Sequence, residues 1–173
     1  MTAQTESSQG QRVLLAEDEA LIRLDLAEML TDAGYDVVGQ ASNGEEAVSL
    51  AESLQPDLII MDVKMPRRDG IDAASEIAAE RVAPVVILTA FGQRELVERA
   101  RDAGAMAYLI KPFSKTDLVP AVELATSRFA EITALEGEVA DLKDRLDTRK
   151  LVDRAKGLLN QRMGLAEAPV DLA

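Results

Sequence analysis

The 173-residue sequence contains no cysteine and no histidine. Without cysteine the chain has neither a disulfide nor a thiolate metal site, as is typical of proteins in a reducing compartment such as the cytoplasm. Without histidine it has no Ser-His-Asp triad, no histidine-ligated zinc and no phosphohistidine. These absences exclude several common catalytic and metal centres.

Aromatic residues, basic charge and long apolar runs are also scarce. Two tyrosines and three phenylalanines in a chain that is 47% hydrophobic indicate an aliphatic core between helices and a sheet. The net charge of −12 excludes a protein that coats nucleic acid with its whole surface. No run approaches the roughly 20 apolar residues that cross a bilayer, and the polar N-terminus does not resemble a secretory signal. We therefore expect a cytoplasmic protein without membrane contact, in which residues 1–11 form a disordered tail.

Five short apolar runs alternate with helical patterns between residues 12 and 127. The runs are Val13–Ala16, Val37–Ala41, Leu58–Met61, Val85–Ala90 and Ala107–Ile110. Apolar residues three and four apart separate them, for example Leu21, Leu24 and Ala27. Nearly continuous apolar strands that alternate with helices predict an α/β fold, a doubly wound parallel (βα)5 sheet covered on both faces.

Charged and hydroxyl side chains follow four of the predicted strands. Glu17 and Asp18 follow the first, Asp62 the third, Thr89 the fourth and Lys111 the fifth. The carboxyl ends of parallel strands meet at one edge of a sheet, so these residues are expected to converge. Three carboxylates at one edge repel one another unless a hard divalent cation binds them, and Mg²⁺ is the predicted cofactor.

This set of side chains is suited to accepting a phosphoryl group. Asp18, Asp62, the backbone carbonyl of Lys64 and, through water, Glu17 are the predicted metal ligands, which leaves one Asp62 oxygen as a nucleophile. The Lys111 ammonium and the Thr89 hydroxyl would then stabilise oxygens of the transferred group.

The same region resembles the receiver domain of bacterial two-component response regulators. The resemblance is carried by LLAEDE, DLIIMDVKMPRRDG, VVILTA and AYLIKPF, which occur in this order. It implies a flavodoxin-like fold, phosphorylation of Asp62 by a sensor histidine kinase, a cis Lys111–Pro112 bond, and Tyr108 as the aromatic residue that follows the Thr89 switch. It also implies that the chain is not an enzyme beyond self-phosphorylation from small donors and autodephosphorylation.

A longer helical pattern begins near Ser114 and continues past the expected end of this domain. Apolar residues three and four apart predict a coiled-coil linker over residues 128–148. They are Val122, Ala125, Phe129, Ile132, Leu135, Val139, Leu142 and Leu146. From Lys143 to Arg162 seven basic residues face three acidic ones, so any basic footprint of the chain lies here.

Residues 149–173 resemble the opening helix of an ANTAR module, the RNA-binding antitermination output of some response regulators. The resemblance is carried by TRKLVDRAKGLLNQRMGLAEA. It implies homodimerisation on phosphorylation and binding of RNA hairpins rather than DNA, with Arg149, Lys150, Arg154 and Lys156 as candidate contacts. An ANTAR module has three helices, whereas this sequence carries about one helix and a turn, so we expect a partial module.

Two other functions are compatible with these patterns. A dimeric protein-interaction switch without an RNA ligand is the first, since the later ANTAR helices are missing. A magnesium-dependent phosphohydrolase is the second, because an aspartate nucleophile at a strand end also serves that chemistry. Such an enzyme usually has a second acid two residues after its nucleophile, where this chain has Lys64.

Overall fold

The computed structural model describes residues 10–90 and 92–163, except for the side chains of 153 and 155–163. The chain divides into two units, Met1–Glu131 and Ile132–Ala173. We call the first the α/β unit and the second the helical unit, and each is described separately.

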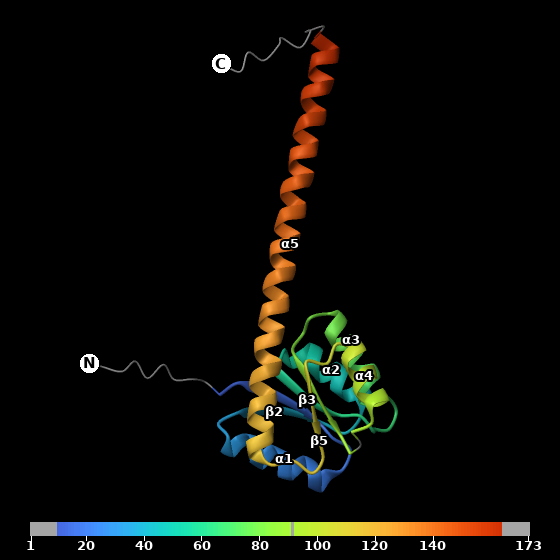
Figure 1. Cartoon of the computed structure of the whole chain (residues 1–173), viewed down its shortest axis with the longest axis vertical. Coiled ribbons are helices and arrows are strands. Elements are labelled where there is room, and N and C mark those ends of the chain that lie inside the picture. Colours follow the sequence, from blue (N-terminus) through green and yellow to red (C-terminus); the bar gives the residue numbers. More distant parts are fainter. Residues whose placement is uncertain (1–9, 91, 164–173) are drawn as a thin grey trace, which may run out of the picture. The chain divides into compact units, whose positions relative to one another are not determined.

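The α/β unit contains a five-stranded parallel sheet (Figure 1). The strand order is β2-β1-β3-β4-β5, so the direction of winding reverses between β1 and β3. The strands are β1 (Arg12–Ala16), β2 (Asp36–Ala41), β3 (Leu58–Asp62), β4 (Val85–Thr89) and β5 (Ala107–Ile110). This topology confirms the predicted doubly wound (βα)5 fold.

Helices connect the strands and cover both faces of the sheet. They are α1 (Ala20–Asp32), α2 (Gly44–Leu54), α3 (Gly70–Ala79), α4 (Arg94–Asp102) and α5 (Lys115–Met163). Strand residues alternate between two cores because successive side chains point to opposite faces. Leu15 and Ile60 pack with α1 and the first turns of α5, whereas Leu14 and Ile59 pack with α2 and α3. The central strands β1, β3 and β4 are buried on both sides, which explains their nearly continuous apolar sequence, whereas the edge strands β2 and β5 are partly exposed.

Side chains cap the starts of three helices. The side-chain oxygen Oδ1 of Asn43 accepts a hydrogen bond from the Glu46 backbone N–H at the start of α2, and the Asp69 carboxylate accepts one from the Asp72 backbone N–H at the start of α3. At α5 the Asp117 carboxylate accepts the Ser114 backbone N–H at 3.0 Å. Caps of this kind stabilise a helix by about 1 kcal/mol and fix its first residue. They therefore set the length of the loops that follow the strands.

The described part of the helical unit is one helix, the portion of α5 from Ile132 to Met163. Its apolar side chains Leu135, Val139, Leu142 and Leu146 are exposed. The helix is continuous from the predicted coiled coil into the predicted ANTAR-like segment, up to Met163. Residues 164–173 of that segment lie outside the described residues. Residues 1–9 of the predicted disordered tail also lie outside them. Gln11, the last residue of that predicted tail, is ordered: its backbone carbonyl accepts a hydrogen bond from the Asp36 backbone N–H.

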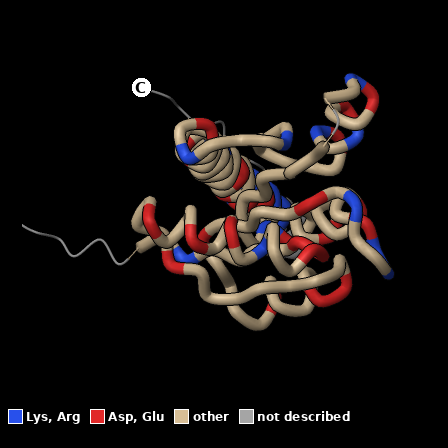
Figure 2. Tube along the Cα trace, turned by 90° about the horizontal axis from the view of Figure 1, so that it is seen from below, with Lys and Arg blue, Asp and Glu red and all other residues tan. Residues whose placement is uncertain are grey.

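No helix among the described residues is both long enough and apolar enough to cross a membrane. Acidic positions, red in Figure 2, are spread over the helices and loops of the α/β unit.

Candidate functional site

Glu17 follows β1 and makes hydrogen bonds through its backbone N–H, its backbone carbonyl and its side chain. Its backbone N–H donates to the Ala41 carbonyl at 3.0 Å, and its own carbonyl accepts from Arg23 Nη1 at 2.7 Å. The Glu19 backbone N–H donates to Glu17 Oε1 at 3.3 Å. The side chain is fully buried, so this carboxylate is a fixed part of the sheet edge. The adjacent Asp18 is exposed and remains open to solvent.

Asp62 is the last residue of β3, between β1 and β4 at the centre of the sheet. Its residue exposure is only 8%. The start of α3 packs against the Asp62 backbone, where the Gly70 N–H donates to the Val63 carbonyl at 2.8 Å. A Cβ on Gly70 would lie 1.9 Å from the Asp62 carbonyl oxygen. Only glycine fits this approach, so Gly70 helps to fix the backbone that carries the Asp62 carboxylate.

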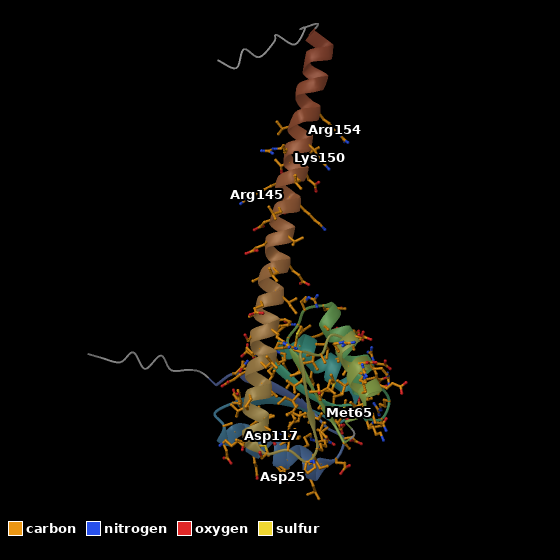
Figure 3. The ribbon with its side chains drawn as sticks, in the orientation of Figure 1. Asp25, Met65, Asp117, Arg145, Lys150 and Arg154 are labelled. Carbon is orange, nitrogen blue, oxygen red and sulfur yellow. The ribbon has the colours of Figure 1, made fainter. Side chains whose placement is uncertain are left out.

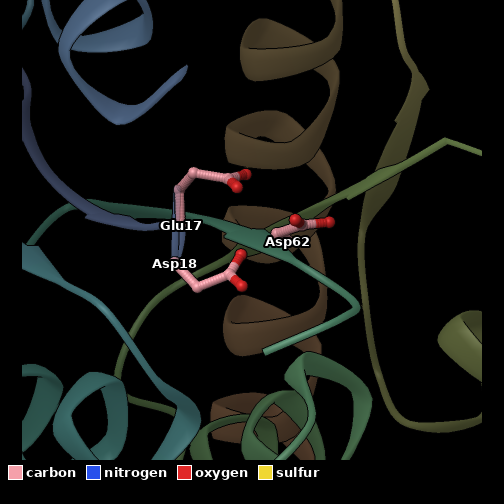
Figure 4. Close-up of side chains that lie close together, drawn as sticks. All are labelled: Glu17, Asp18 and Asp62. Carbon is pink, nitrogen blue, oxygen red and sulfur yellow. The ribbon is translucent and has the colours of Figure 1, made fainter. Parts of the chain in front are cut away.

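The three carboxylates converge as the strand ends predict. Glu17, Asp18 and Asp62 each offer one oxygen, and these oxygens all lie within 4.8 Å of one another. Figure 4 shows the three side chains close together, with the carboxylates of Glu17 and Asp18 directed to the side on which Asp62 lies. Carboxylate oxygens in this arrangement are ligands that Mg²⁺ prefers, so the donor set fits the predicted metal.

Lys111 joins the site from the end of β5. Its Nζ donates to Glu17 Oε2 at 2.9 Å and to Asp62 Oδ2 at 3.1 Å. Its backbone N–H donates to the Thr89 carbonyl at 2.8 Å, and the Lys111–Pro112 bond is cis, as the resemblance implies. The sequence indicated an ammonium directed at a phosphoryl oxygen, whereas in the structure it already bridges two carboxylates.

These contacts alter the protonation of both partners. Burial, supported by the nearby Asp62 charge, raises the pKa of Glu17 to about 7, although the hydrogen bond from Lys111 opposes the shift. Burial alone would lower the pKa of Lys111, but its hydrogen bonds and charge attraction to Glu17 and Asp62 outweigh burial and raise it. The ammonium is therefore the stable form of Lys111 in this site.

A cavity of about 370 Å³ opens beside Asp62. Its lining includes Asp18, Lys64, Thr89 and Lys111, together with Glu19, Val63, Ala90 and Leu96. Thr89 is 4% exposed at the end of β4. The cavity is thus bordered by the carboxylates of Asp18 and Asp62, the Thr89 hydroxyl and the Lys111 ammonium.

Comparison with known proteins identifies the α/β unit. The family model of the response regulator receiver domain matches residues 13–123. The chain belongs to this response regulator family. It is 70% identical over 166 residues to the transcriptional regulatory protein PdtaR of Mycobacterium tuberculosis, a match that covers 96% of this chain and 81% of PdtaR.

Solved receiver domains share the fold of this response regulator. The receiver domain of the response regulator NarL from Mycobacterium tuberculosis aligns with a TM-score of 0.66 and 27% identity, over 69% of this chain and 98% of that one. The CheY chain in a CheX–CheY–BeF3–Mg complex from Borrelia burgdorferi aligns with a TM-score of 0.62 and 27% identity, over 65% of this chain and 86% of that one.

Tyr108 of the receiver domain lies outside the acidic site. It is 47% exposed on β5 and lines a separate cavity of about 310 Å³. That cavity is bordered by α4, β5 and α5, through residues that include Val97, Ala121 and Leu124. The predicted switch aromatic is therefore at a helix-bordered surface, and the acidic cavity does not contain it.

The candidate RNA contacts lie in the helical unit of the response regulator. Arg149, Lys150 and Arg154 are exposed, and the latter two are labelled in Figure 3. Lys150 and Arg154 are four residues apart and so share one side of the helix. The side chain of Lys156 lies outside the described residues.

Sequence reasoning missed two residues that support the receiver site. Arg23 is one, because its guanidinium binds the Glu17 carbonyl from the first turns of α1. Gly70 is the other, because its lack of a side chain admits the Asp62 carbonyl. For Arg23 the sequence offered only its closeness to an acidic residue, whereas Gly70 ends the DLIIMDVKMPRRDG motif, which was a signal for it.

Proposed function

We propose that this response regulator accepts a phosphoryl group on Asp62 from a sensor histidine kinase. The observation that carries this proposal is the contact of Lys111 Nζ with Asp62 Oδ2 at the mouth of a cavity bordered by Asp18 and Thr89. A carboxylate oxygen of Asp62 attacks phosphorus and forms a new O–P bond. The bond between phosphorus and the donor histidine nitrogen breaks, and its electron pair leaves on that nitrogen.

Asp18, Asp62 and Glu17 would hold Mg²⁺, with the backbone carbonyl of Lys64 as a further ligand. Bound Mg²⁺ supplies charge neutralisation of the acidic cluster and of the phosphoryl oxygens. The fit of the donor oxygens supports this assignment, as does the Mg²⁺ named in the complex of the similar Borrelia CheY. The Lys111 ammonium neutralises a second phosphoryl oxygen, and the Thr89 hydroxyl donates to a third.

The output proposed for this chain is phosphorylation-dependent dimerisation together with RNA-binding antitermination. After phosphorylation Thr89 turns toward the new anion, Tyr108 occupies the space it leaves, and the surface formed by α4, β5 and α5 changes. Arg149, Lys150, Arg154 and Lys156 contact the phosphates of RNA hairpins. The similarity to PdtaR, a transcriptional regulatory protein, supports a role in transcription.

Intact mass spectrometry tests the acceptor. Protein treated with acetyl phosphate and Mg²⁺ is expected to gain one phosphoryl group, and Asp62→Asn none. Asp69→Asn, which changes an aspartate outside the acidic cluster, is the matched control and should gain mass like the unaltered protein. No mass gain in the unaltered protein would refute the proposal, whereas multiple turnover of small phosphate esters would favour a phosphohydrolase.

A dimeric protein-interaction switch without RNA is the second candidate. The exposed apolar side chains of the helical unit favour it, because they offer a protein-binding face whether or not RNA binds. Binding of tandem RNA hairpins, measured with and without acetyl phosphate, separates the two. Phosphorylation-dependent binding that weakens with salt and is lost in Lys150→Glu/Arg154→Glu supports RNA recognition. Dimerisation without any RNA binding supports the second candidate.

A further inference from the structure

The helical unit carries an apolar stripe that its own structure leaves uncovered. We call Ile132, Leu135, Val139, Leu142 and Leu146 the seam. Four of them are exposed by 60% at Leu135, 50% at Val139, 58% at Leu142 and 55% at Leu146. The described part of this unit is a single helix, so no other element of the unit covers the seam. An alternating three-and-four spacing is what a second helix covers in a coiled coil.

The spacing of the seam assigns heptad positions. Residues 132, 139 and 146 occupy position a, and residues 135 and 142 occupy position d. The β-branched side chains of Ile132 and Val139 at a, with leucine at d, are typical of two-stranded coiled coils. The seam therefore fits one further helix of the same kind, and the charges beside it determine the direction of that helix.

Charged side chains flank the seam on both sides and are exposed. On one side, at position g, Glu138 is followed one heptad later by Arg145. On the other side, at position e, Glu136 is followed by Lys143 and then by Lys150. Each side thus changes from acidic to basic along the helix. In a second copy that runs in the opposite direction, the basic residues would lie beside the acidic residues of the first copy.

Parallel pairing of two copies would combine attractive and repulsive contacts between these charges. In a parallel coiled coil a residue at g faces the residue at e five positions later in the partner. Glu138 would face the partner's Lys143, which is favourable. Arg145 would face the partner's Lys150, which places like charges opposite one another. Attraction and repulsion then occur in equal number within this segment.

Antiparallel pairing brings opposite charges together around residues 135–146. In the register that sets Leu135 against the partner's Leu146, Val139 packs against the partner's Leu142. Position g then faces g, and e faces e, so Glu138 meets the partner's Arg145 and Glu136 meets the partner's Lys143. Symmetry repeats each contact, which gives four favourable pairs. Shifting the register so that Leu135 meets the partner's Val139 sets Glu138 against the partner's Glu138, so the first register is preferred.

We propose that residues 135–146 form an antiparallel two-stranded coiled coil with a second copy of this chain, in the register that sets Leu135 against the partner's Leu146. The inference rests on the proposed dimerisation and adds its surface, direction and charge pairs. Glu138 and Arg145 determine the direction, and the seam supplies the apolar contact.

The absence of cysteine from the chain permits a direct test by cross-linking. Full-length Leu135→Cys and Leu146→Cys are prepared separately and oxidised, alone and mixed, with Mg²⁺ and beryllofluoride. In the antiparallel register residue 135 lies about 11 residues, or ~16 Å, along the helix axis from its own copy, which exceeds disulfide reach. We expect a disulfide dimer in the mixture and none with either variant alone. Efficient self-linking of both single variants would overturn the antiparallel direction.

Charge reversal provides a second, independent readout. Arg145→Glu replaces two attractions by two repulsions in the antiparallel dimer and should weaken the dimer Kd about tenfold in sedimentation. Glu138→Arg/Arg145→Glu exchanges the charges and should restore the original Kd. Asp144→Lys, on the outer side of the helix, is the matched control and should leave the Kd unchanged. A tighter dimer in Arg145→Glu would indicate that this residue faces the partner's Lys150 and would overturn the proposal.

The outcomes separate this inference from the proposed function. A parallel dimer that forms only with beryllofluoride overturns the direction and leaves phosphorylation-dependent dimerisation intact. An antiparallel dimer that forms equally without beryllofluoride supports the direction and overturns its control by phosphorylation. A monomer at all protein concentrations, with and without beryllofluoride, overturns both.

Discussion

The Lys111 ammonium donates a 2.9 Å hydrogen bond to Glu17, whose carboxylate is fully buried. The same ammonium lies 3.1 Å from Asp62 Oδ2, so one cation links the end of β1 to the end of β3 through the side chains of Glu17 and Asp62. The cluster thus has a positive charge of its own even before a metal binds. This arrangement makes Lys111 a structural residue as well as a candidate phosphoryl ligand.

Lys111→Met is therefore expected to destabilise the fold. The substitution leaves the buried Glu17 carboxylate without its cation, and breaking a buried ion pair costs about 3–5 kcal/mol. Because Lys111 is partly exposed and Glu17 can take up a proton, we expect about 2 kcal/mol in urea unfolding without Mg²⁺ at neutral pH. Glu17→Gln/Lys111→Met should recover most of the loss. A stability equal to that of the unaltered protein would show that the bridge contributes nothing.

Mg²⁺ is expected to raise the stability of this chain through the acidic cluster. A ligand that binds only the folded state at 100 times its Kd adds about 2.7 kcal/mol to the free energy of unfolding. Asp18→Asn removes one donor from an exposed position, so it should abolish most of the Mg²⁺-dependent rise in Tm while the metal-free Tm changes little.

Asp25→Asn is the matched control for the metal experiment, because Asp25 is an exposed aspartate on α1 outside the acidic cluster (Figure 3). Its Tm should respond to Mg²⁺ as the unaltered protein does. An equal Mg²⁺ response in Asp18→Asn would remove this residue from the ligand set.

The fold was largely predictable because local and tertiary requirements coincide. The buried strands are short apolar runs, and the capping residue Asn43 marks the start of α2. The errors in the strand boundaries were small: β1, β2, β3 and β4 each differ from the predicted run by one residue at one end. Gly137 lies inside α5, and the helix continues through it. Patterns that repeat over many residues predict elements well.

The sequence predicted which side chains of the site lie close together, but it did not predict the hydrogen bonds between them. Parallel topology brings Glu17, Asp18 and Asp62 to one edge whatever their rotamers, so their closeness followed from their positions. The bridge from Lys111 to Glu17 depends on side-chain geometry and burial, which no spacing encodes. The outward position of Tyr108 has the same origin, since either face of β5 was compatible with its sequence.

Gly70→Ala should disrupt the site and the fold together. The new Cβ would lie 1.9 Å from the Asp62 carbonyl oxygen and 2.8 Å from its carbon, both of which are backbone atoms. Relief requires a shift of β3 or of the start of α3, and we expect a loss of about 3 kcal/mol. Urea unfolding measures the loss, and mass spectrometry should show reduced phosphorylation of the folded fraction. An unchanged unfolding midpoint would mean that the loop yields easily.

Gly137→Ala is expected to have the opposite effect, although it is the same chemical change. Among the described residues, no atom other than those of the neighbouring residues and the helix's own backbone lies within 4 Å of a Cβ at this position, and the residue is exposed within α5. Alanine loses less backbone entropy than glycine in a helix interior, which is worth about 1 kcal/mol. Circular dichroism at the helical band, followed with temperature, should show that the helical signal persists to higher temperature. Position 137 lies on the outer side of the helix, opposite the seam, so sedimentation should give a Kd no weaker than that of the unaltered protein. A weaker dimer would place this residue in the interface and contradict the heptad assignment.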